Sequence, residues 1–381
     1  MIRLLFTGYV AQRPGGMETF MKTLASELPK DEFQISVLCI DSPPPGVREA
    51  FEEINVRFFY PQERLIRKKR ETDIHEVVQT IGPIDIIHCN GSLNIWRWLK
   101  GAEEVEIPVR IFHGHHPIQK HGGFLREWYV RHYTIPLLSR HATHCVFCSQ
   151  FVKDQWMRLS PTTKIPCDVQ YCGIDCSELE KVPKGLRPSL GIPEDAIVFG
   201  HIGRFSRVKN HSFLIEIFKE IAVREPRAYF LLVGSGQREE QVRRHIARRG
   251  LQDRVVLTGY RSDIPDLLAT MNVFVLPSLF EGWSLVSVEA HALGIPSLCS
   301  DQTGASFETC LLPEMIKTLS LRDSADRWAV TAIALAKETL QPREECLKVV
   351  REAPFELSRA TQSFADYYQS CFANSFSRKG N

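Results

Sequence analysis

The chain has 381 residues, which exceeds the size at which a single hydrophobic core usually stops growing, so two domains are expected. Hydrophobic residues make up 44% and charged residues 24% of the sequence, which excludes a disordered or fibrous protein. The formal net charge of +2 gives no global field that would favour a nucleic-acid partner.

The N-terminal segment does not have the pattern of a signal peptide. Its short apolar run is followed by Gln12, Arg13 and Pro14 instead of a small-residue cleavage site. No later stretch reaches the ~18 uninterrupted apolar residues of a membrane span. The 11 cysteines are odd in number and scattered through apolar runs, a usage that fits a reducing compartment. We therefore expect a cytoplasmic protein.

Apolar runs rich in β-branched residues alternate with amphipathic stretches of helical length, which is typical of parallel sheets covered by helices on both faces. The first half predicts strands at residues 2–8, 34–40, 56–60, 84–89, 109–113 and 144–148. The second half predicts strands at residues 197–203, 229–234, 254–259, 273–277 and 296–300.

A polar stretch with Pro and Gly and no apolar period separates the two halves and predicts a linker near residues 178–192. We accordingly expect an N-terminal Rossmann-like domain over residues 1–180 and a C-terminal Rossmann-like domain over residues 181–354. Residues 355–381 contain an apolar pattern that predicts a terminal helix.

Four cysteines are alternative candidates for a zinc site: Cys145, Cys148, Cys172 and Cys176. Cys145 and Cys148 lie in a predicted strand, where their odd spacing directs them to opposite faces. This geometry disfavours zinc.

A glycine pair, Gly15 and Gly16, follows the first predicted strand and precedes a predicted helix. Glycines let the backbone approach a ligand closely, and the N–H groups of a helix N-terminus suit a phosphate or a developing negative charge. Such turns are also common for structural reasons, and the strict dinucleotide fingerprint is absent. Both interpretations remain open for this pair alone.

The second half opens with two cations in one strand-to-helix turn, Arg204 and Lys209. The planar guanidinium of Arg204 can donate two parallel hydrogen bonds, and the ammonium group of Lys209 acts as a point charge. Together they can bind a diphosphate. A role in solubility would explain either cation alone, but it poorly explains why both lie in one strand-to-helix turn. Four residues at or directly after the ends of predicted strands of this half are further candidates for substrate binding: Gly203, Gly234, Tyr260 and Arg261.

Two carboxylates, Glu281 and Glu289, lie eight positions apart across a predicted loop and the start of a helix. This spacing puts Glu289 about one and a half turns into the helix, where both can face one cleft. A carboxylate accepts two hydrogen bonds from a vicinal diol. This chemistry fits binding of a ribose by Glu289 and of hexose hydroxyls by Glu281. The backbone amides at the helix N-terminus can hold the phosphate. These amides belong to Gly282, Trp283, Ser284 and Leu285.

These motifs resemble those of the family 4 glycosyltransferases. The resemblance covers nearly the whole chain and rests on the Gly-Gly loop, on residues 203–210, 233–236, 259–268 and 277–282, and on Glu289-Ala290-x-x-x-Gly294-x-Pro296. It implies an α/β GT-B fold, with two Rossmann-like domains, a cleft between them and a C-terminal helix that crosses back to the first domain. It also implies retention of the anomeric configuration.

Within this family, residues 110–116 and 300–328 resemble bacterial capsule and exopolysaccharide biosynthesis glycosyltransferases. The resemblance implies that His113 lies near the transferred sugar, with His115 as the second choice. The His-Gly-His-His run is also a candidate metal site, but the family needs no metal and Asp-x-Asp is absent. Trp283 with Ser284, and residues 302–306, depart from the family pattern, so a reshaped sugar pocket is expected.

We therefore predict a retaining glycosyltransferase with His113, Glu281, Arg204 and Lys209 as catalytic residues and with no cofactor or metal. The expected donor is a nucleotide diphosphate sugar, a UDP-hexose or UDP-N-acetylhexosamine. The expected acceptor is a saccharide or polyprenyl-linked saccharide in cell-surface polysaccharide biosynthesis. A sugar-nucleotide epimerase of the same fold and a non-catalytic nucleotide-sugar-binding protein are the alternatives. Acceptor-independent conversion of the donor favours the first, and binding without turnover favours the second.

Two segments of the first half, residues 64–70 and 120–133, combine clustered cations with nearby aromatic residues. This combination favours peripheral contact with an anionic inner membrane leaflet and a lipid-linked acceptor. Solvated helix faces explain such runs at least as often, so both interpretations remain open.

Overall fold

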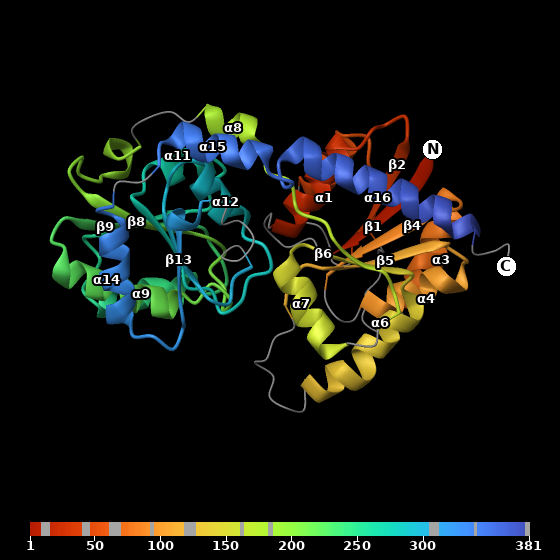
Figure 1. Ribbon diagram of the computed structural model, residues 1–381, viewed down its shortest axis with the longest axis horizontal. Helices are drawn as coiled ribbons and strands as arrows, with labels where there is room; N and C mark the ends of the chain where they lie inside the picture. Colours follow the sequence, from red (N-terminus) through yellow and green to blue (C-terminus); the bar gives the residue numbers. More distant parts are fainter. Residues whose placement is uncertain are drawn as a thin grey trace. The chain divides into compact units, whose positions relative to one another are not determined.

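A computed structural model describes residues 1–8, 16–39, 46–60, 70–91, 95–117, 127–160, 164–181, 186–304, 312–338 and 341–377. The chain forms two compact units (Figure 1). The first contains residues 1–173 and 357–381, and the second contains residues 174–356.

The first unit is a parallel sheet with the strand order β3-β2-β1-β4-β5-β6-β7. Its strands are β1 (Ile2–Gly8), β2 (Phe33–Cys39), β3 (Arg57–Phe59), β4 (Ile86–Asn90), β5 (Val109–Gly114), β6 (His144–Phe147) and β7 (Cys167–Val169). Its helical segments are α1 (Gly16–Glu27), α2 (Val47–Glu52), α3 (Arg70–Ile81), α4 (Trp96–Glu104), the π-helical turn η4 (Val130–Thr134), α6 (Ile135–His141), α7 (Gln150–Leu159) and α16 (Leu357–Ser377). The predicted C-terminal helix is confirmed, and it packs against α1 and β5 of this unit.

The second unit repeats this plan with the strand order β10-β9-β8-β11-β12-β13. Its strands are β8 (Ile197–Ile202), β9 (Ala228–Val233), β10 (Val255–Gly259), β11 (Val273–Leu276), β12 (Ser297–Ser300) and β13 (Ile316–Leu319). Its helical segments are α8 (Cys176–Glu180), η5 (Pro188–Leu190), α9 (His211–Arg224), α10 (Glu239–Arg248), α11 (Ile264–Ala269), α12 (Leu285–Ala292), η6 (Pro313–Met315), α14 (Ala325–Leu335) and α15 (Arg343–Glu352).

The direction of chain progression reverses at one place in each sheet. In the first unit the reversal lies between β1 and β4, and in the second unit between β8 and β11. Doubly wound sheets bind ligands outside the carboxyl ends of the strands at such switch points. The predicted Rossmann-like architecture of both halves is confirmed, and it indicates where each unit can hold a ligand.

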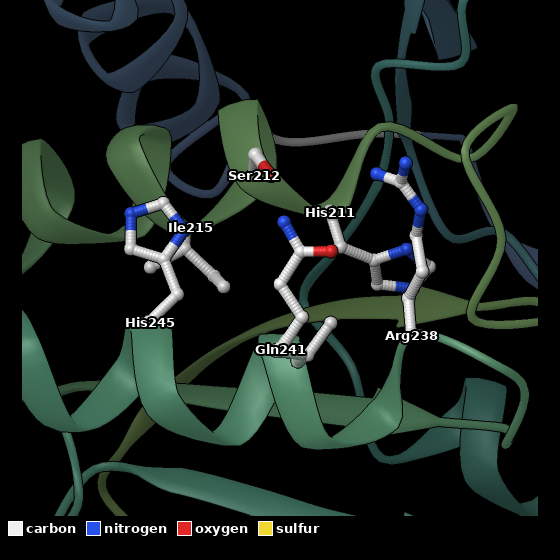
Figure 2. A pocket seen from close by; sticks show the side chains of 7 residues that line it. His211, Ser212, Ile215, Arg238, Gln241 and His245 are labelled. Atoms are coloured by element: carbon white, nitrogen blue, oxygen red, sulfur yellow. The ribbon is translucent and has the colours of Figure 1, made fainter.

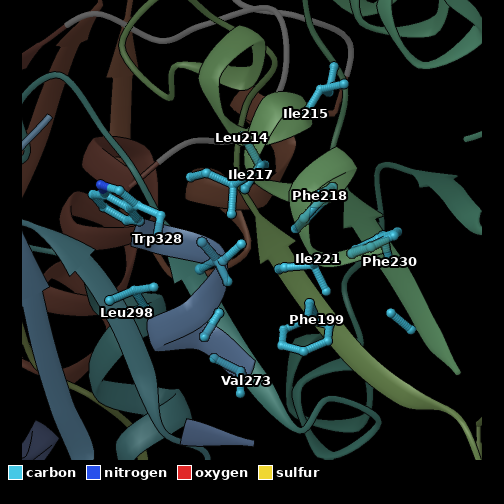
Figure 3. Close-up of a cluster of buried hydrophobic side chains, with 14 of the residues drawn as sticks. Phe199, Leu214, Ile215, Ile217, Phe218, Ile221, Phe230, Val273, Leu298 and Trp328 are labelled. Atoms are coloured by element: carbon cyan, nitrogen blue, oxygen red, sulfur yellow. The ribbon is translucent and has the colours of Figure 1, made fainter. Parts of the chain in front are cut away.

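The core of the second unit shows why the apolar runs form strands. Phe199 on β8 and Phe230 on β9 are fully buried, and Phe218 of α9 stacks on Phe230 with ring centroids 4.3 Å apart. Figure 3 shows these rings in one buried cluster with Leu298 of β12 and Trp328 of α14. Strands covered by helices on both faces are continuously apolar, which explains their clear sequence signal.

The boundaries of the two units differ from those predicted. The chain leaves the first unit after Gly173 and returns at Leu357, instead of at positions 180/181 and 354/355. Part of the predicted linker near 178–192 is helical, in α8 and η5. Ile174 pairs with the second unit because its backbone N–H donates to Phe355 O at 2.9 Å.

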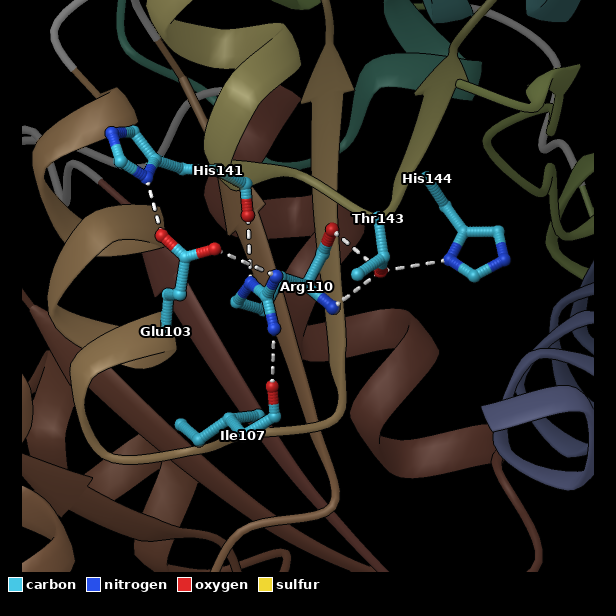
Figure 4. Close-up of polar contacts among 6 residues, drawn as sticks. All are labelled: Glu103, Ile107, Arg110, His141, Thr143 and His144. Carbon is cyan, nitrogen blue, oxygen red and sulfur yellow. Dashed lines mark hydrogen bonds and ion pairs between the residues drawn. The ribbon is translucent and has the colours of Figure 1, made fainter. Parts of the chain in front are cut away.

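A polar cluster anchors the beginning of β5, the strand that carries His113. The Arg110 guanidinium donates to the carbonyl oxygens of His141 and Ile107 at 2.7 and 2.8 Å. The Glu103 carboxylate lies 3.4 Å from Arg110 Nη2 and 2.7 Å from His141 Nδ1 (Figure 4). These contacts tie β5 to α4 and α6, so the position of the strand is held from both neighbouring helices.

Gly234, at the end of β9, has a conformation that requires glycine. Its φ is 132°, and a Cβ there would lie 2.2 Å from the carbonyl oxygen of Gly203. Gly203 in turn donates its N–H to Val233 O at 2.9 Å. Gly234 therefore lets the loops after β8 and β9 approach closely, which shapes the turn that carries Arg204.

Candidate functional site

The predicted site residues fall into two groups, one in each unit. The group of the second unit lies in the segments that follow β8, β9, β10 and β11, which include both strands at the switch point. The group of the first unit lies at the carboxyl end of β5 and at the start of α1. Gly15 lies outside the described residues, and Gly16 is the exposed first residue of α1.

The two cations predicted to bind a diphosphate have different environments. Lys209 Nζ lies 2.7 Å from Glu281 Oε2, and the two side chains are only 18% and 13% exposed. Arg204 is exposed, and among the described residues its side chain forms no ion pair. The charge of Lys209 is neutralised by Glu281, whereas that of Arg204 is not. The site therefore presents a net positive charge to an anionic ligand.

The loop after β11 holds Glu281 through its backbone as well as its side chain. The Glu281 N–H donates to Gln302 O at 3.0 Å, and Gly304 N–H donates to Glu281 O at 2.9 Å. Ser278 Oγ lies 3.3 Å from Glu281 Oε2. Gln302 and Gly304, which belong to the segment that departs from the family pattern, thus hold the Glu281 backbone.

The N-terminus of α12 begins beside this pair. Ser284 is the N-cap, and its Oγ accepts hydrogen bonds from Ser287 N–H at 3.3 Å and Ser287 Oγ at 2.8 Å. Leu285 is the first helical residue, so its N–H and that of Val286 lie in the first turn, where α-helices offer donors to anions.

Trp283 precedes this cap, and its ring is held by core packing. The side chain is 8% exposed, and its ring centroid lies 5.3 Å from that of Phe355. Only the backbone of Trp283 is therefore placed for the phosphate contact that the sequence predicts, and the ring itself stabilises the second unit.

Glu289 lies in the second turn of α12 and is half-buried. Burial raises the pKa of Glu289 from its usual value to about 7, because the surrounding protein disfavours the charged form. Glu281, by contrast, forms an ion pair with Lys209. The two predicted carboxylates therefore sit in electrostatically distinct surroundings.

Tyr260 and Arg261 follow β10. Tyr260 is 52% exposed, which leaves its ring available to a ligand. Arg261 Nε lies 2.8 Å from Asp263 Oδ1, so its guanidinium is already paired. This pairing makes Arg261 a weaker candidate for an anionic ligand than Arg204.

The histidines of the first unit are buried and linked. His113 is fully buried at the end of β5, and its Nδ1 lies 2.9 Å from His88 Nε2 on β4. His115 Nε2 lies 2.8 Å from Asn90 Oδ1. Burial lowers the pKa of His113 and His115 well below the usual histidine value, so both are neutral at physiological pH.

Sequence reasoning missed three members of this network: His88, Asn90 and Tyr368. A signal was available for two of them, since His88 and Asn90 alternate at the end of a predicted strand and so share one face. Tyr368 lies in the C-terminal helix and gives no local signal.

The structure also has a small recess between α9 and α10, lined by His211, Ser212, Ile215, Arg238, Gln241, Val242 and His245 (Figure 2). None of the predicted site residues lines it. In the described part of the chain, no group of three or more His, Cys, Asp or Glu side chains is placed to hold a metal ion. The described cysteines, which include all four zinc candidates, form no disulfide with one another.

Two Rossmann-like units in one chain, each with polar residues at the ends of its central strands, define the GT-B class. A family model described as Glycosyltransferase Family 4 matches residues 14–178, and one described as Glycosyl transferases group 1 matches residues 184–309. Together they match most of the chain. The chain belongs to the family 4 glycosyltransferases and is a glycosyltransferase with the GT-B fold.

The chain is also similar to individual glycosyltransferases and to a solved structure. The chain is 26% identical over 343 residues to a putative glycosyltransferase, EpsF of Bacillus subtilis, with 88% of each chain covered. It is 35% identical over 118 residues to an Escherichia coli UDP-Gal:alpha-D-GlcNAc-diphosphoundecaprenol alpha-1,3-galactosyltransferase, covering 30% of each. A crystal structure of Anabaena HepE in complex with UDP-glucose superposes with a TM-score of 0.78 and 21% identity, covering 97% of this chain and 100% of HepE.

Proposed function

We propose that this glycosyltransferase transfers a hexose or N-acetylhexosamine from a UDP-sugar to a saccharide or polyprenyl-linked saccharide in cell-surface polysaccharide synthesis, with retention of configuration. The observation that carries the proposal is the available Arg204 beside the Lys209–Glu281 pair at the β8/β11 switch point. HepE binds UDP-glucose, and the E. coli relative acts on a diphosphoundecaprenol-linked sugar, which supports the proposed donor and acceptor classes.

In the proposed donor complex, Arg204, Lys209 and the amides of residues 282–285 hold the diphosphate. As the glycosidic bond breaks, the bonding electrons pass to the phosphate oxygen, and these groups stabilise the developing charge. The departing phosphate then accepts the acceptor hydroxyl proton while that oxygen bonds to the anomeric carbon from the same face. His113 is proposed to donate a hydrogen bond to the transferred sugar, and Gly16 to bring the backbone near it.

A panel of nucleotide sugars tests the donor assignment. Ligands that bind the native state raise the unfolding temperature, so UDP-sugars should stabilise the protein more than the corresponding ADP- and GDP-sugars. Sugar release or epimerisation without acceptor, or stabilisation without turnover with any saccharide acceptor, would contradict the proposed transfer.

Transfer should not require a divalent metal, because Arg204 and Lys209 supply the positive charge. We expect the initial rate with a UDP-sugar to be the same in excess EDTA as in buffer. A control with added Mg²⁺ or Mn²⁺ should also leave the rate unchanged. A rate that falls in EDTA and returns with one of these ions would contradict metal independence.

The raised pKa of Glu289 predicts pH-dependent donor binding. If the carboxylate accepts hydrogen bonds from the ribose diol, only its ionised form accepts both, so affinity should fall as pH decreases through about 7. We expect roughly tenfold weaker binding of a UDP-sugar at about pH 6 than at about pH 8. The bridged diphosphate of this ligand does not titrate in that interval.

Glu289→Gln is the matched control for this measurement by calorimetry. It should bind the same UDP-sugar more weakly at the higher pH, but with an affinity that no longer changes with pH. An equal pH dependence in both proteins would assign the titration to another group.

Peripheral membrane contact is proposed for the helical segment before α6. Trp128, Tyr129 and Tyr133 are 45%, 57% and 51% exposed, and Arg131 and His132 are exposed beside them. Exposed aromatic rings with nearby cations suit an anionic bilayer surface. The amino-terminal end of this segment extends away from the sheet of its own unit (Figure 1). The other predicted cationic segments, 64–69 and 120–126, lie outside the described residues.

Sedimentation with lipid vesicles tests this contact. Binding to vesicles that contain phosphatidylglycerol should exceed binding to pure phosphatidylcholine vesicles and should decrease at least about tenfold in a Trp128→Ser, Tyr129→Ser, Tyr133→Ser variant. Equal sedimentation of the variant would contradict the role of these rings. In the described part of the chain, no helix has the length and apolarity needed to cross the bilayer.

A further inference from the structure

Two cysteines of the first unit lie directly opposite each other on neighbouring strands. Cys145 of β6 and Cys167 of β7 are register partners in this parallel pair, and the Cys145 N–H donates to Pro166 O at 2.8 Å. Side chains of register partners lie on the same face of a sheet, and neighbouring strands are about 4.8 Å apart. A disulfide spans Cα atoms about 4.4–6.8 Å apart, so the two sulfur atoms can bond without a change in strand register.

The two thiols differ in their exposure to solvent. Cys145 is 8% exposed and lies between Cys167 and Phe112, its register partner on β5. Cys167 lies on the edge strand of the sheet and is half-buried, and its Sγ–H donates to Ile165 O at 3.3 Å. A small oxidant in solution therefore reaches Cys167 before Cys145.

Helix α7 places a cation on the same face of the sheet as this pair. Trp156 of α7 packs on Phe112 and Phe147, with ring centroids 4.9 and 5.9 Å apart. Helix α7 therefore covers the face to which Cys145, the register partner of Phe112, also belongs. Lys153 precedes Trp156 by three positions, so both side chains lie on one side of the helix. Lys153 is half-buried, and within the described part of the chain its ammonium group forms no ion pair.

These surroundings make Cys167 the more acidic of the two thiols. A hydrogen bond from the Cys145 thiol lowers the pKa of Cys167, and the charge of Lys153 acts in the same direction. The same hydrogen bond raises the pKa of Cys145 well above its usual value, and burial adds to this shift. The thiolate, which is the nucleophilic form of cysteine, therefore forms at Cys167 in preference to Cys145.

We propose that Cys167 and Cys145 form a redox-sensitive site at which hydrogen peroxide converts the two thiols to a disulfide. The Cys167 thiolate attacks one peroxide oxygen, and the O–O bond breaks. The products are a sulfenic acid on Cys167 and hydroxide, which combines with the proton that Cys167 had released. The Cys145 sulfur then attacks the sulfenic sulfur, the S–O bond breaks, and the Cys145 proton leaves with the hydroxide as water. Together the two thiols lose two electrons and two protons, and the peroxide becomes two water molecules.

The disulfide would join a short edge strand covalently to the rest of its sheet. Strand β7 has three residues and is half-buried throughout. Just beyond it, the Gln170 N–H donates to Phe147 O at 2.9 Å, and Ser363 Oγ of α16 donates to Gln170 Oε1 at 2.8 Å. Oxidation would therefore fix the strand whose end holds the C-terminal helix. This inference is independent of the proposed donor and acceptor.

Oxidation of the full chain by a few equivalents of hydrogen peroxide tests the pairing without any substitution. After alkylation of the remaining thiols and proteolysis, mass spectrometry should identify a Cys145–Cys167 disulfide that dithiothreitol reduces. Cys172→Ser is the matched control, because it removes another buried thiol of the same unit, and it should leave the yield of this disulfide unchanged. A main disulfide between other cysteines, or oxidation of Cys167 without cross-linking to Cys145, would overturn the proposal.

Two single variants separate the attacking thiol from the resolving thiol. In Cys145→Ser the sulfenic acid on Cys167 has no thiol to resolve it, so dimedone should trap it. In Cys167→Ser the dimedone adduct on Cys145 should be at least about tenfold less abundant, because that thiol is buried and protonated. Equal amounts of adduct in the two variants would contradict the assigned roles.

The rate at which iodoacetamide alkylates Cys167 in the reduced protein measures the contribution of Lys153. Only the thiolate reacts, so Lys153→Gln should lower the rate at about pH 7 by about threefold or more. Lys153→Arg keeps the charge and should retain most of the wild-type rate. An unchanged rate in Lys153→Gln, or a Cys167 that reacts more slowly than the buried cysteines, would contradict the activation of Cys167 at this site.

Discussion

Lys209→Ala should lower kcat/KM for transfer from a UDP-sugar by at least about 100-fold. The substitution removes a cation that is proposed to stabilise the departing diphosphate, and the loss of one charge-stabilising group typically lowers the rate by about this factor. It also leaves the carboxylate of Glu281, which lies 2.7 Å from Lys209 Nζ, without its counter-charge beside an anionic ligand. Both consequences act in the same direction.

The second consequence gives this prediction a sharp test. Removing the carboxylate charge with Glu281→Gln in the Lys209→Ala background should restore part of the lost UDP affinity, although each single substitution impairs transfer. Lys317→Ala, an exposed lysine on β13, is the control for general loss of positive charge and should leave kcat/KM unchanged. A double variant that binds UDP no better than Lys209→Ala does would contradict the coupling of Lys209 and Glu281.

Glu281→Gln and Glu289→Gln should differ in which step they impair, turnover for the first and nucleotide binding for the second. Glu289 is proposed to contact the ribose that every nucleotide shares, so its substitution should weaken UDP and the UDP-sugar alike, by about tenfold at about pH 8. Glu281 is proposed to contact the sugar. Glu281→Gln should therefore lower kcat by roughly 100-fold and leave UDP affinity unchanged or tighter, because Lys209 is released from its ion pair.

Calorimetry with UDP and steady-state rates with the full donor measure both effects on the same preparations. If Glu281→Gln loses UDP affinity as severely as Glu289→Gln, the two carboxylates do not have the separate roles proposed for them. The electrostatic contrast between the two carboxylates, one paired with Lys209 and one with its pKa raised to about 7, is the structural basis of this difference.

Most of the fold was predictable because its strands are buried on both faces. All eleven predicted strands are present, with ends that differ by at most two residues within the described part. The two missed strands, β7 and β13, lie at the sheet edges. β7 is half-buried throughout, and the central residues of β13 are exposed, so neither forms a continuous apolar run.

The candidate site was predictable only where it follows strand ends. Residues of the loops after β8 and β11 were identified from their own segments, but the ion pair between Lys209 and Glu281 joins positions 72 residues apart. The Tyr368–His88 contact joins positions 280 residues apart, and no periodicity within α16 distinguishes Tyr368 from other core-facing residues. Such contacts depend on the tertiary arrangement, which local spacing does not encode.

Arg204 and Lys209 are proposed to bind the donor through its phosphates, and calorimetric titration with uridine, UMP and UDP separates this contact from binding of the nucleoside. The Arg204→Ala, Lys209→Ala double variant should bind uridine as the wild type does, while its affinity for UDP falls by at least about 100-fold. An unchanged affinity for UDP, or an equal loss of affinity for uridine and UDP, would show that these two side chains do not bind the donor through its phosphates.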